Sequence, residues 1–218
     1  MGLSNYVPSS RVSQAGVCTS TTRPASPFEG QMIYETDTNR VLVYDNTAWV
    51  MIADTDTPPG LELIKTQTVG PAVSSVTVSD VFSSTFDNYR VIVASITASA
   101  NDQVSLLTFG STSTGYYGSL NLQSYASSTP ASPLNRNNSS SLYLIASDTS
   151  ATHFMSFDVY SPNLAQRTGI SGSGFGYLYT STFAGFVANT TVYTGFTITA
   201  GSGTMTGGTI RVYGYRNS

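Results

Sequence analysis

Charged residues are scarce in this chain of 218 residues. Only 10% of them are Asp, Glu, Lys or Arg, whereas about a quarter is usual in soluble domains. Lysine occurs once, at Lys65, and glutamate three times, at Glu29, Glu35 and Glu62. Because both residue types are strong helix formers, their scarcity excludes helical bundles, coiled coils and nucleotide-binding α/β sheets.

Cysteine, histidine, basic charge and long apolar runs are also lacking. Cys18 has no second cysteine to pair with, and together with His153 it supplies two of the four ligands of a structural zinc site. A net charge of −3 leaves no basic footprint for nucleic acid. No apolar run approaches the roughly 18 residues that cross a bilayer. We therefore expect no nucleic-acid partner, no membrane insertion and no cofactor.

Few residues could form a catalytic site. A Ser–His153–Asp158 triad stays open, because triads assemble in space and serine is abundant, but a histidine at a strand end is the simpler interpretation. Paired carboxylates for glycoside hydrolysis have little support, since Asp148 and Asp158 are the only acidic residues in the last third of the chain. We expect a protein that is not an enzyme.

Two motifs resemble ligand loops but lack essential neighbours. Asp54 and Asp56 could contribute to a calcium site, yet the loop glycine and the closing glutamate of an EF-hand are missing. The glycine-rich run at residues 172–176 precedes a strand-like segment, whereas a phosphate-binding loop precedes a helix. We interpret the first motif as part of a solvated linker and the second as a turn or bulge.

The abundant residues are Thr, Val, Tyr, Phe, Ser and Gly, which favour strands and turns. The sequence therefore predicts an all-β protein in four parts. An extended anchoring arm at residues 1–28 is interrupted by prolines and polar runs. A small antiparallel meander for assembly follows at 29–53, then a proline-containing linker at 54–60. A β-sandwich, jelly-roll-like, is expected at 61–218.

The meander has three expected strands, separated by turns at residues 36–39 and 46–47. A unit of this size has too little core to fold alone. We therefore expect a partner surface to cover its aromatic and apolar residues. The predicted interface for oligomerisation and assembly consists of Met32, Tyr34, Val43, Tyr44, Trp49 and Met51.

Short strand-like runs alternate with turn signals after residue 61, as in a sandwich or barrel. Met155, Phe157 and Val159 alternate with polar residues, which indicates a half-buried strand. Residues 127–141, rich in Pro, Asn and Ser, are expected to form a long exposed loop. The predicted strands span residues 62–69, 75–81, 89–98, 104–109, 142–146, 153–160, 174–179, 182–187, 192–199 and 209–215.

Tyrosine is the residue type most suited to recognition, with 14 copies. Exposed rings stack on sugar faces, and Asn and Ser side chains bond the hydroxyl groups around them. The alternative is that the tyrosines fill strand faces and subunit contacts. The candidate receptor contacts are Tyr116, Tyr117, Tyr125, Asn137 and Asn138.

Two stretches resemble structural proteins of tailed bacteriophages. Residues 23–40, RPASPFEGQMIYETDTNR, followed by VYDNTAWV at 43–50, are similar to a short module common in those proteins. The ending GTIRVYGYR, at residues 208–216, resembles the last strand of C-terminal β-domains in phage fibre-like and minor structural proteins. The looser resemblance between these ends includes NYRVIV at residues 88–93.

The resemblance implies a virion component without catalytic activity, often a homotrimer, assembled in the host cytoplasm. Residues 1–52 would bind other virion proteins, and the C-terminal domain would form a fibre- or spike-like appendage that contacts a host surface glycan or receptor. A capsid decoration protein, acting as a cement or knob, is the main alternative. A glycan-binding or depolymerising tailspike comes third.

Overall fold

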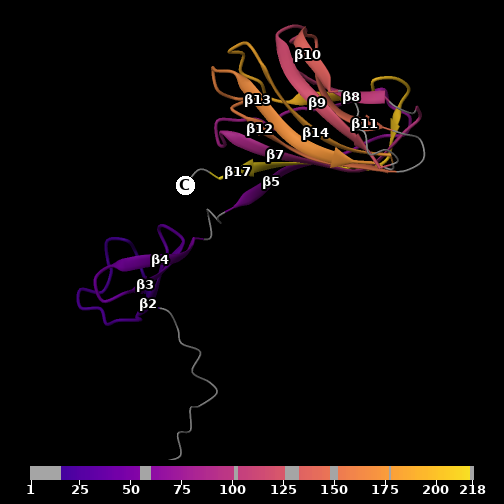
Figure 1. Ribbon diagram of the computed structural model, residues 1–218. Helices are drawn as coiled ribbons and strands as arrows, with labels where there is room; N and C mark the ends of the chain where they lie inside the picture. Colours follow the sequence, from indigo (N-terminus) through magenta and orange to yellow (C-terminus); the bar gives the residue numbers. More distant parts are fainter. Residues whose placement is uncertain are drawn as a thin grey trace, which may run out of the picture. The chain divides into compact units, whose positions relative to one another are not determined.

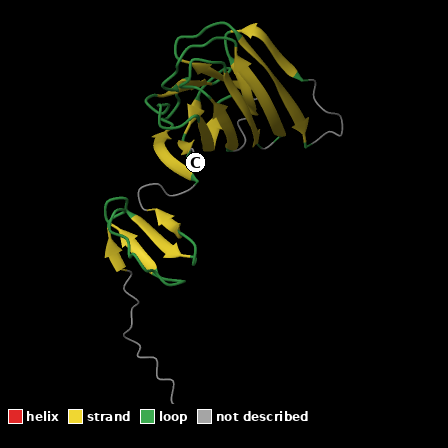
Figure 2. Cartoon of the chain, turned by 90° about the vertical axis from the view of Figure 1, so that its left-hand side faces the viewer, coloured by secondary structure: helices red, strands yellow, loops and turns green. Residues whose placement is uncertain are grey.

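The computed structural model describes residues 16–54, 60–100, 103–125, 133–147, 152–176 and 178–216. All regular secondary structure in these residues is β-strand, which confirms the predicted fold class (Figures 1 and 2). The described part accordingly contains no helix that could span a membrane. The chain divides into two compact units, Met1–Pro59 and Gly60–Ser218. The division falls inside the segment in which the sequence predicts a linker.

The N-terminal unit is a four-stranded sheet in the order β1 (Gly16–Cys18), β2 (Met32–Glu35), β3 (Arg40–Tyr44), β4 (Trp49–Asp54). Strands β2, β3 and β4 form the expected antiparallel meander. Its two turns contain Asn39 at φ 50° and Asn46 at φ 76°. Asparagine tolerates this left-handed conformation better than most residues do, which explains why these turns are tight.

The extended arm predicted for residues 1–28 is wrong from residue 16 onward. Strand β1 pairs in parallel with β2 and adds a fourth strand to the meander. Ser20 donates its backbone N–H (2.9 Å) and its hydroxyl (2.6 Å) to the Asp37 carboxylate, and Arg23 forms an ion pair with Glu35. Hydrogen bonds and an ion pair thus attach residues 16–28 to the meander, which offers little apolar area for packing. Residues 1–15 of the predicted arm lie outside the described residues.

The C-terminal unit consists of two sheets. Eight strands of the larger sheet follow the order β10-β9-β14-β13-β12-β7-β17-β5, and β16 pairs with β7 beside that path. The smaller sheet has the order β11-β8-β15-β6. The strands are β5 (Leu61–Thr68), β6 (Ser75–Val78), β7 (Asn88–Ala98), β8 (Gln103–Phe109), β9 (Tyr116–Ser124), β10 (Leu134–Ser139), β11 (Leu142–Ser147), β12 (His153–Tyr160), β13 (Thr168–Phe175), β14 (Tyr179–Val187), β15 (Phe196–Thr199), β16 (Met205–Thr206) and β17 (Thr209–Tyr215).

Eight of these strands have the connectivity of a jelly roll. Strand β5 pairs with β17, β6 with β15, β7 with β12, and β8 with β11, all antiparallel. These are the nested pairs of one long hairpin that has been rolled into two four-stranded sheets, β5-β17-β7-β12 and β6-β15-β8-β11. The predicted jelly-roll-like sandwich is therefore confirmed at the level of strand order.

Two inserted hairpins extend one sheet of the roll. The hairpin β9–β10 lies between β8 and β11 in sequence, and β13–β14 lies between β12 and β15. The β13–β14 hairpin adds to the edge strand β12, and the β9–β10 hairpin adds to β14, so that β13, β14, β9 and β10 continue the larger sheet. Figure 1 shows β12, β13 and β14 side by side as one curved sheet. The extension gives the larger sheet a broad outer face.

The core lies between the two sheets and is rich in aromatic rings. Phe157 on β12 meets Phe196 on β15 edge-on, with ring centroids 6.2 Å apart, and Phe82 stacks on Phe196 at 5.8 Å. Burial alternates along β12 as the sequence predicts, with Met155, Phe157 and Val159 buried. These contacts tie the larger sheet to the smaller one.

The long loop predicted for residues 127–141 is wrong in part, because β10 occupies 134–139. Its sequence, LNRNNS, has little β propensity, and the strand exists because it pairs with β9. The glycine-rich run at residues 172–176 is not a turn or bulge either, since it lies largely in β13. A Cβ on Gly172 would lie 2.4 Å from Cβ of Phe157, so the missing side chain makes room for the core.

Candidate functional site

The N-terminal sheet leaves one face open. Val17, Met32 and Val50 on this face are 71%, 42% and 45% exposed, high values for apolar side chains. Strand register places Tyr34 beside Val17, and Val43 between Met32 and Val50. We call this surface the open face; its members are Val17, Met32, Tyr34, Val41, Val43 and Val50.

The opposite face of the same sheet carries the small core. Ile33 and Leu42 are buried there beside Glu35, whose side chain is fully buried in its ion pair with Arg23. The hydrogen bond from Arg23 lowers the pKa of Glu35, against the opposing effect of burial. Because Arg23 belongs to the loop between β1 and β2, this loop is held against the core by charge.

The six predicted interface residues therefore do not form one surface. Met32, Tyr34 and Val43 lie together on the open face. The others lie on the core face, where Tyr44 and Trp49 form a ring pair with centroids 5.4 Å apart. The remaining residue, Met51, pairs with Leu42 and is 52% exposed. The open face is the part of the predicted interface that is continuous.

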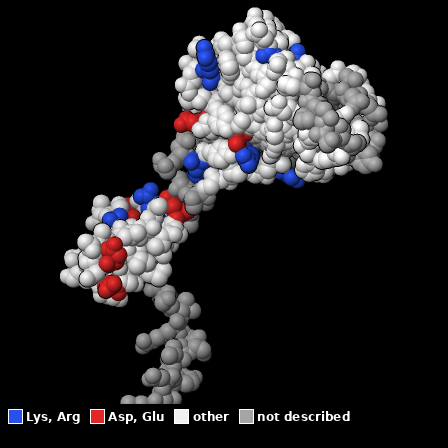
Figure 3. Space-filling view, in the orientation of Figure 1, with Lys and Arg blue, Asp and Glu red and all other residues white. Residues whose placement is uncertain are grey.

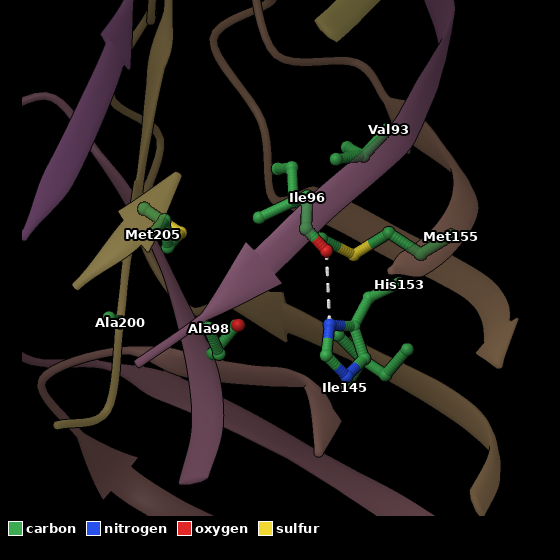
Figure 4. A pocket seen from close by; sticks show the side chains of 9 residues that line it. Val93, Ile96, Ala98, Ile145, His153, Met155, Ala200 and Met205 are labelled. Atoms are coloured by element: carbon green, nitrogen blue, oxygen red, sulfur yellow. Dashed lines mark hydrogen bonds between the residues drawn. The ribbon is translucent and has the colours of Figure 1, made fainter. Parts of the chain in front are cut away.

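The histidine of the chain lines a small cavity between the sheets (Figure 4). His153 is buried, and its Nδ1 lies 3.1 Å from the Ile96 carbonyl oxygen. The cavity is lined mainly by apolar side chains, including Met155 and Met205, and has a volume of about 20 Å³. That volume holds about one water molecule. It is too small for a substrate.

A triad of His153 with Asp158 is excluded by the strand geometry. Both residues lie on β12, five positions apart, so their side chains point to opposite faces of the sheet. Asp158 accepts hydrogen bonds from Arg90 (2.8 and 2.7 Å) and from the Tyr215 hydroxyl (2.7 Å). Burial alone would raise the pKa of Asp158, but these bonds together lower it. The carboxylate thus serves an ion-pair network.

Metal ligands do not gather anywhere in the described residues. No group of three or more His, Cys, Asp or Glu side chains there could hold an ion. Asp54, one half of the calcium motif considered above, accepts a hydrogen bond from Arg40 at 3.2 Å. Its expected companion, Asp56, lies outside the described residues.

Tyr116 is not a receptor contact, because it is fully buried. Its hydroxyl accepts the Phe109 N–H at 2.8 Å and donates to the Thr112 carbonyl at 3.2 Å. Burial raises its pKa to about 12. The ring points inward because Tyr116 and Tyr117, as neighbours on one strand, face opposite sides of the sheet.

The other candidate contacts are at the surface. Asn138 has φ 53° and accepts the Gly115 N–H through its side chain at 3.1 Å, so it has a structural role in a bulge. Asn137 is exposed in the same bulge, opposite Tyr117 in the register between β9 and β10. Tyr125, directly after β9, is 57% exposed.

Tyr117 borders a shallow hollow of about 430 Å³ on the outer face of the larger sheet. Its ring stacks on Phe186, with centroids 5.3 Å apart and planes inclined by 15°. Tyr160 lines the other side of the hollow, and its hydroxyl lies 2.9 Å from the Ser171 hydroxyl. Small residues, including Gly169, leave space between the rings. We call this the Tyr117 hollow.

Tyr125 borders a second hollow, of about 520 Å³, on the same face. Phe154 and Phe175 stack beside it, with ring centroids 5.3 Å apart and planes inclined by 20°. Ser173 and Thr182 contribute hydroxyl groups to the lining. We call this the Phe175 hollow. Sequence reasoning missed Phe154, although its alternation with Met155 on β12 places it on the outer face.

Comparison with known proteins identifies no relative of this chain. No family model, no curated protein and no solved structure matches it. Function must therefore be inferred from the open face, the outer face of the larger sheet and the chemistry of their residues.

Proposed function

We propose that this chain is a structural protein of a bacteriophage virion that assembles as a homotrimer through its N-terminal unit. The jelly roll would then be displayed on the particle as a fibre- or spike-like appendage. The same N-terminal unit would also bind the virion protein on which the trimer is mounted. The observation that carries this proposal is the open face, an apolar surface on a unit with very little core of its own.

The N-terminal unit has a small core. Ile33 and Leu42 are the buried apolar side chains among the described residues of the N-terminal unit. Single small sheets are marginal in water unless a further surface covers them. Val17, Met32 and Val50 are available for such cover, since contiguous exposed apolar side chains mark interaction surfaces.

A second copy of the chain is a suitable partner for this face. None of its six members carries a charge, so copies can meet there without burying an unpaired ion. The trimeric state and the virion context come from the resemblance of residues 23–50 to phage structural proteins. The exposed apolar face of the sheet is the physical feature that supports the assembly implied by this resemblance.

Light scattering on the purified full chain tests the proposal. We expect three times the chain mass of 23.1 kDa. A Val50→Asp substitution should give monomers, because an unpaired carboxylate would be buried in each interface. Val192→Asp is the matched control: Val192 is 50% exposed, close to the 45% of Val50, but lies in the C-terminal unit. A monomeric wild type, or equal effects of both variants, would contradict the proposal.

A further inference from the structure

Exposed aromatic rings gather on one face of the C-terminal unit. Four aromatic side chains of the described residues are exposed, namely Phe28, Tyr125, Tyr160 and Phe175. Phe28 belongs to the N-terminal unit. The other three lie directly after β9, on β12 and on β13, and share the outer face of the larger sheet, where they line the two hollows. Exposed apolar side chains that share one face mark a candidate interaction surface.

The two hollows lie along the same strands. On β13, Phe175 belongs to one hollow and Gly169 to the other, and Gly169 pairs with Phe186 on β14. Six residues of strand separate these positions, a distance of ~20 Å at about 3.3 Å per residue. A ligand that reaches both hollows must be a chain of several rings, since one ring is far shorter.

Hydroxyl and amide side chains line the Phe175 hollow and the sheet beside it. Ser156, Ser173, Thr182 and Asn121 form one continuous register across β12, β13, β14 and β9. Ser171 lies two residues from Ser173 on the same face of β13. Each of these side chains both donates and accepts hydrogen bonds. The outer face therefore combines aromatic walls with neutral groups that bind hydroxyls.

Few charged side chains flank the two hollows, one of them Arg211 on β17, which pairs with Ile92 of the Phe175 hollow. None of the described residues that line the two hollows is charged. Asp158, on the same face of β12, is neutralised by Arg90, and the Arg167 guanidinium lies over the Phe186 ring at 5.3 Å. Charged side chains are few and scattered on the side of the C-terminal unit that Figure 3 shows. An ionic ligand would have little to bind here.

We propose that the outer face of the larger sheet binds a neutral oligosaccharide, with sugar rings seated in the Phe175 hollow and the Tyr117 hollow. The C–H groups on a sugar face carry partial positive charge and pack against the negative face of an aromatic ring. The hydroxyls on the sugar rim match the serine, threonine and asparagine side chains in and beside the Phe175 hollow.

The inference goes beyond the proposed function and does not depend on it. Both hollows lie within the C-terminal unit, so each copy of the chain carries a complete site. The mass of the particle in solution tests the assembly proposal, and the affinity of each chain for an oligosaccharide tests the binding proposal. Either proposal can therefore fail without affecting the other.

A glycan array tests the proposal with the full chain as analyte and with printed neutral and acidic oligosaccharides as probes. We expect binding to neutral chains and stronger binding to hexasaccharides than to disaccharides, because only the longer chains reach both hollows. Calorimetry with the strongest neutral hexasaccharide then measures affinity. Phe175→Ser and Tyr125→Ser should each weaken binding by about tenfold or more, as expected for loss of an aromatic anchor.

Phe28→Ser is the matched control, since Phe28 is 68% exposed but lies in the N-terminal unit. Its affinity should equal that of the wild type. Circular dichroism melting curves establish that all variants remain folded, which is expected because the replaced rings are at the surface. Binding to no neutral oligosaccharide, binding to acidic ones alone, or full affinity in both Phe175→Ser and Tyr125→Ser would overturn the proposal.

Discussion

The two units of the chain are stabilised in different ways. The described part of the C-terminal unit buries 29 apolar side chains in one continuous core between two sheets. The N-terminal unit buries Ile33 and Leu42, with Glu35 between Arg23 and Thr38. The first unit therefore has the core of an independent domain, whereas the second relies on an ion pair and turn hydrogen bonds around a small core.

This difference explains why the same strand chemistry gives a covered core in one unit and an exposed apolar face in the other. Both units have sheets with an apolar face. In the jelly roll, a second sheet covers that face, and Phe157 on β12 contacts Phe196 on β15. In the N-terminal unit, the loop before β2 covers one face only, and the open face stays exposed.

The largest expected effect is on the core of the jelly roll. Phe157→Ala should lower the free energy of unfolding of the C-terminal unit by about 3–5 kcal/mol, since it removes a buried ring that contacts Phe183 and Phe196. Urea unfolding followed by circular dichroism measures this change. Trp49 is the only tryptophan and belongs to the N-terminal unit, so its fluorescence should report an unchanged transition there.

A Trp49 transition that shifts as far as the circular dichroism transition would show that the units unfold together, and the comparison between them would fail.

A smaller effect is expected from the ion pair of the N-terminal unit. The pKa of Glu35 is lowered by its hydrogen bond from Arg23, below the ordinary value of 4.5. Its contribution to stability is therefore complete above pH 4.5 and disappears as pH falls through the lower folded-state pKa. Glu35→Gln should lower the Trp49 unfolding midpoint at neutral pH, and the gap to wild type should close in acid.

Asp37 also has a lowered pKa, because it accepts the hydroxyl and backbone hydrogen bonds of Ser20. The wild type and Glu35→Gln both keep Asp37, so the difference between their Trp49 unfolding midpoints at each pH reports Glu35 alone. A gap that stays constant down to strongly acidic pH would show that the ion pair does not stabilise the unit.

Composition and alternation were sufficient to predict the all-β class and most strands. Strong alternation, as in Met155, Phe157 and Val159, fixed which residues enter the core. The strands β9 and β10 and most of β13 were missed, and the sequences of the last two, LNRNNS and TGISGSGF, lack apolar alternation. These segments are strands because they pair with neighbouring strands, and a glycine at 172 is favourable because Phe157 occupies the space of a side chain there. Neither the pairing nor the packing can be inferred from the local sequence.

The candidate sites were harder to predict, because each combines strands that are distant in sequence. Tyr117 on β9 and Phe186 on β14 become neighbours only through the inserted hairpins. Tyr116 was misplaced because two adjacent tyrosines on a strand cannot both face outward. The open face could have been separated from the core face by alternation alone, since Val43 and Tyr44 are consecutive residues of β3.

The most direct test of the central claim is thermal unfolding of the full chain at concentrations that span about a hundredfold range. Trp49 fluorescence reports the N-terminal unit, and circular dichroism is dominated by the strands of the jelly roll. If the open face is covered by other copies, mass action should raise the Trp49 midpoint with concentration and leave the jelly-roll midpoint unchanged. A Trp49 midpoint that is independent of concentration would contradict the account.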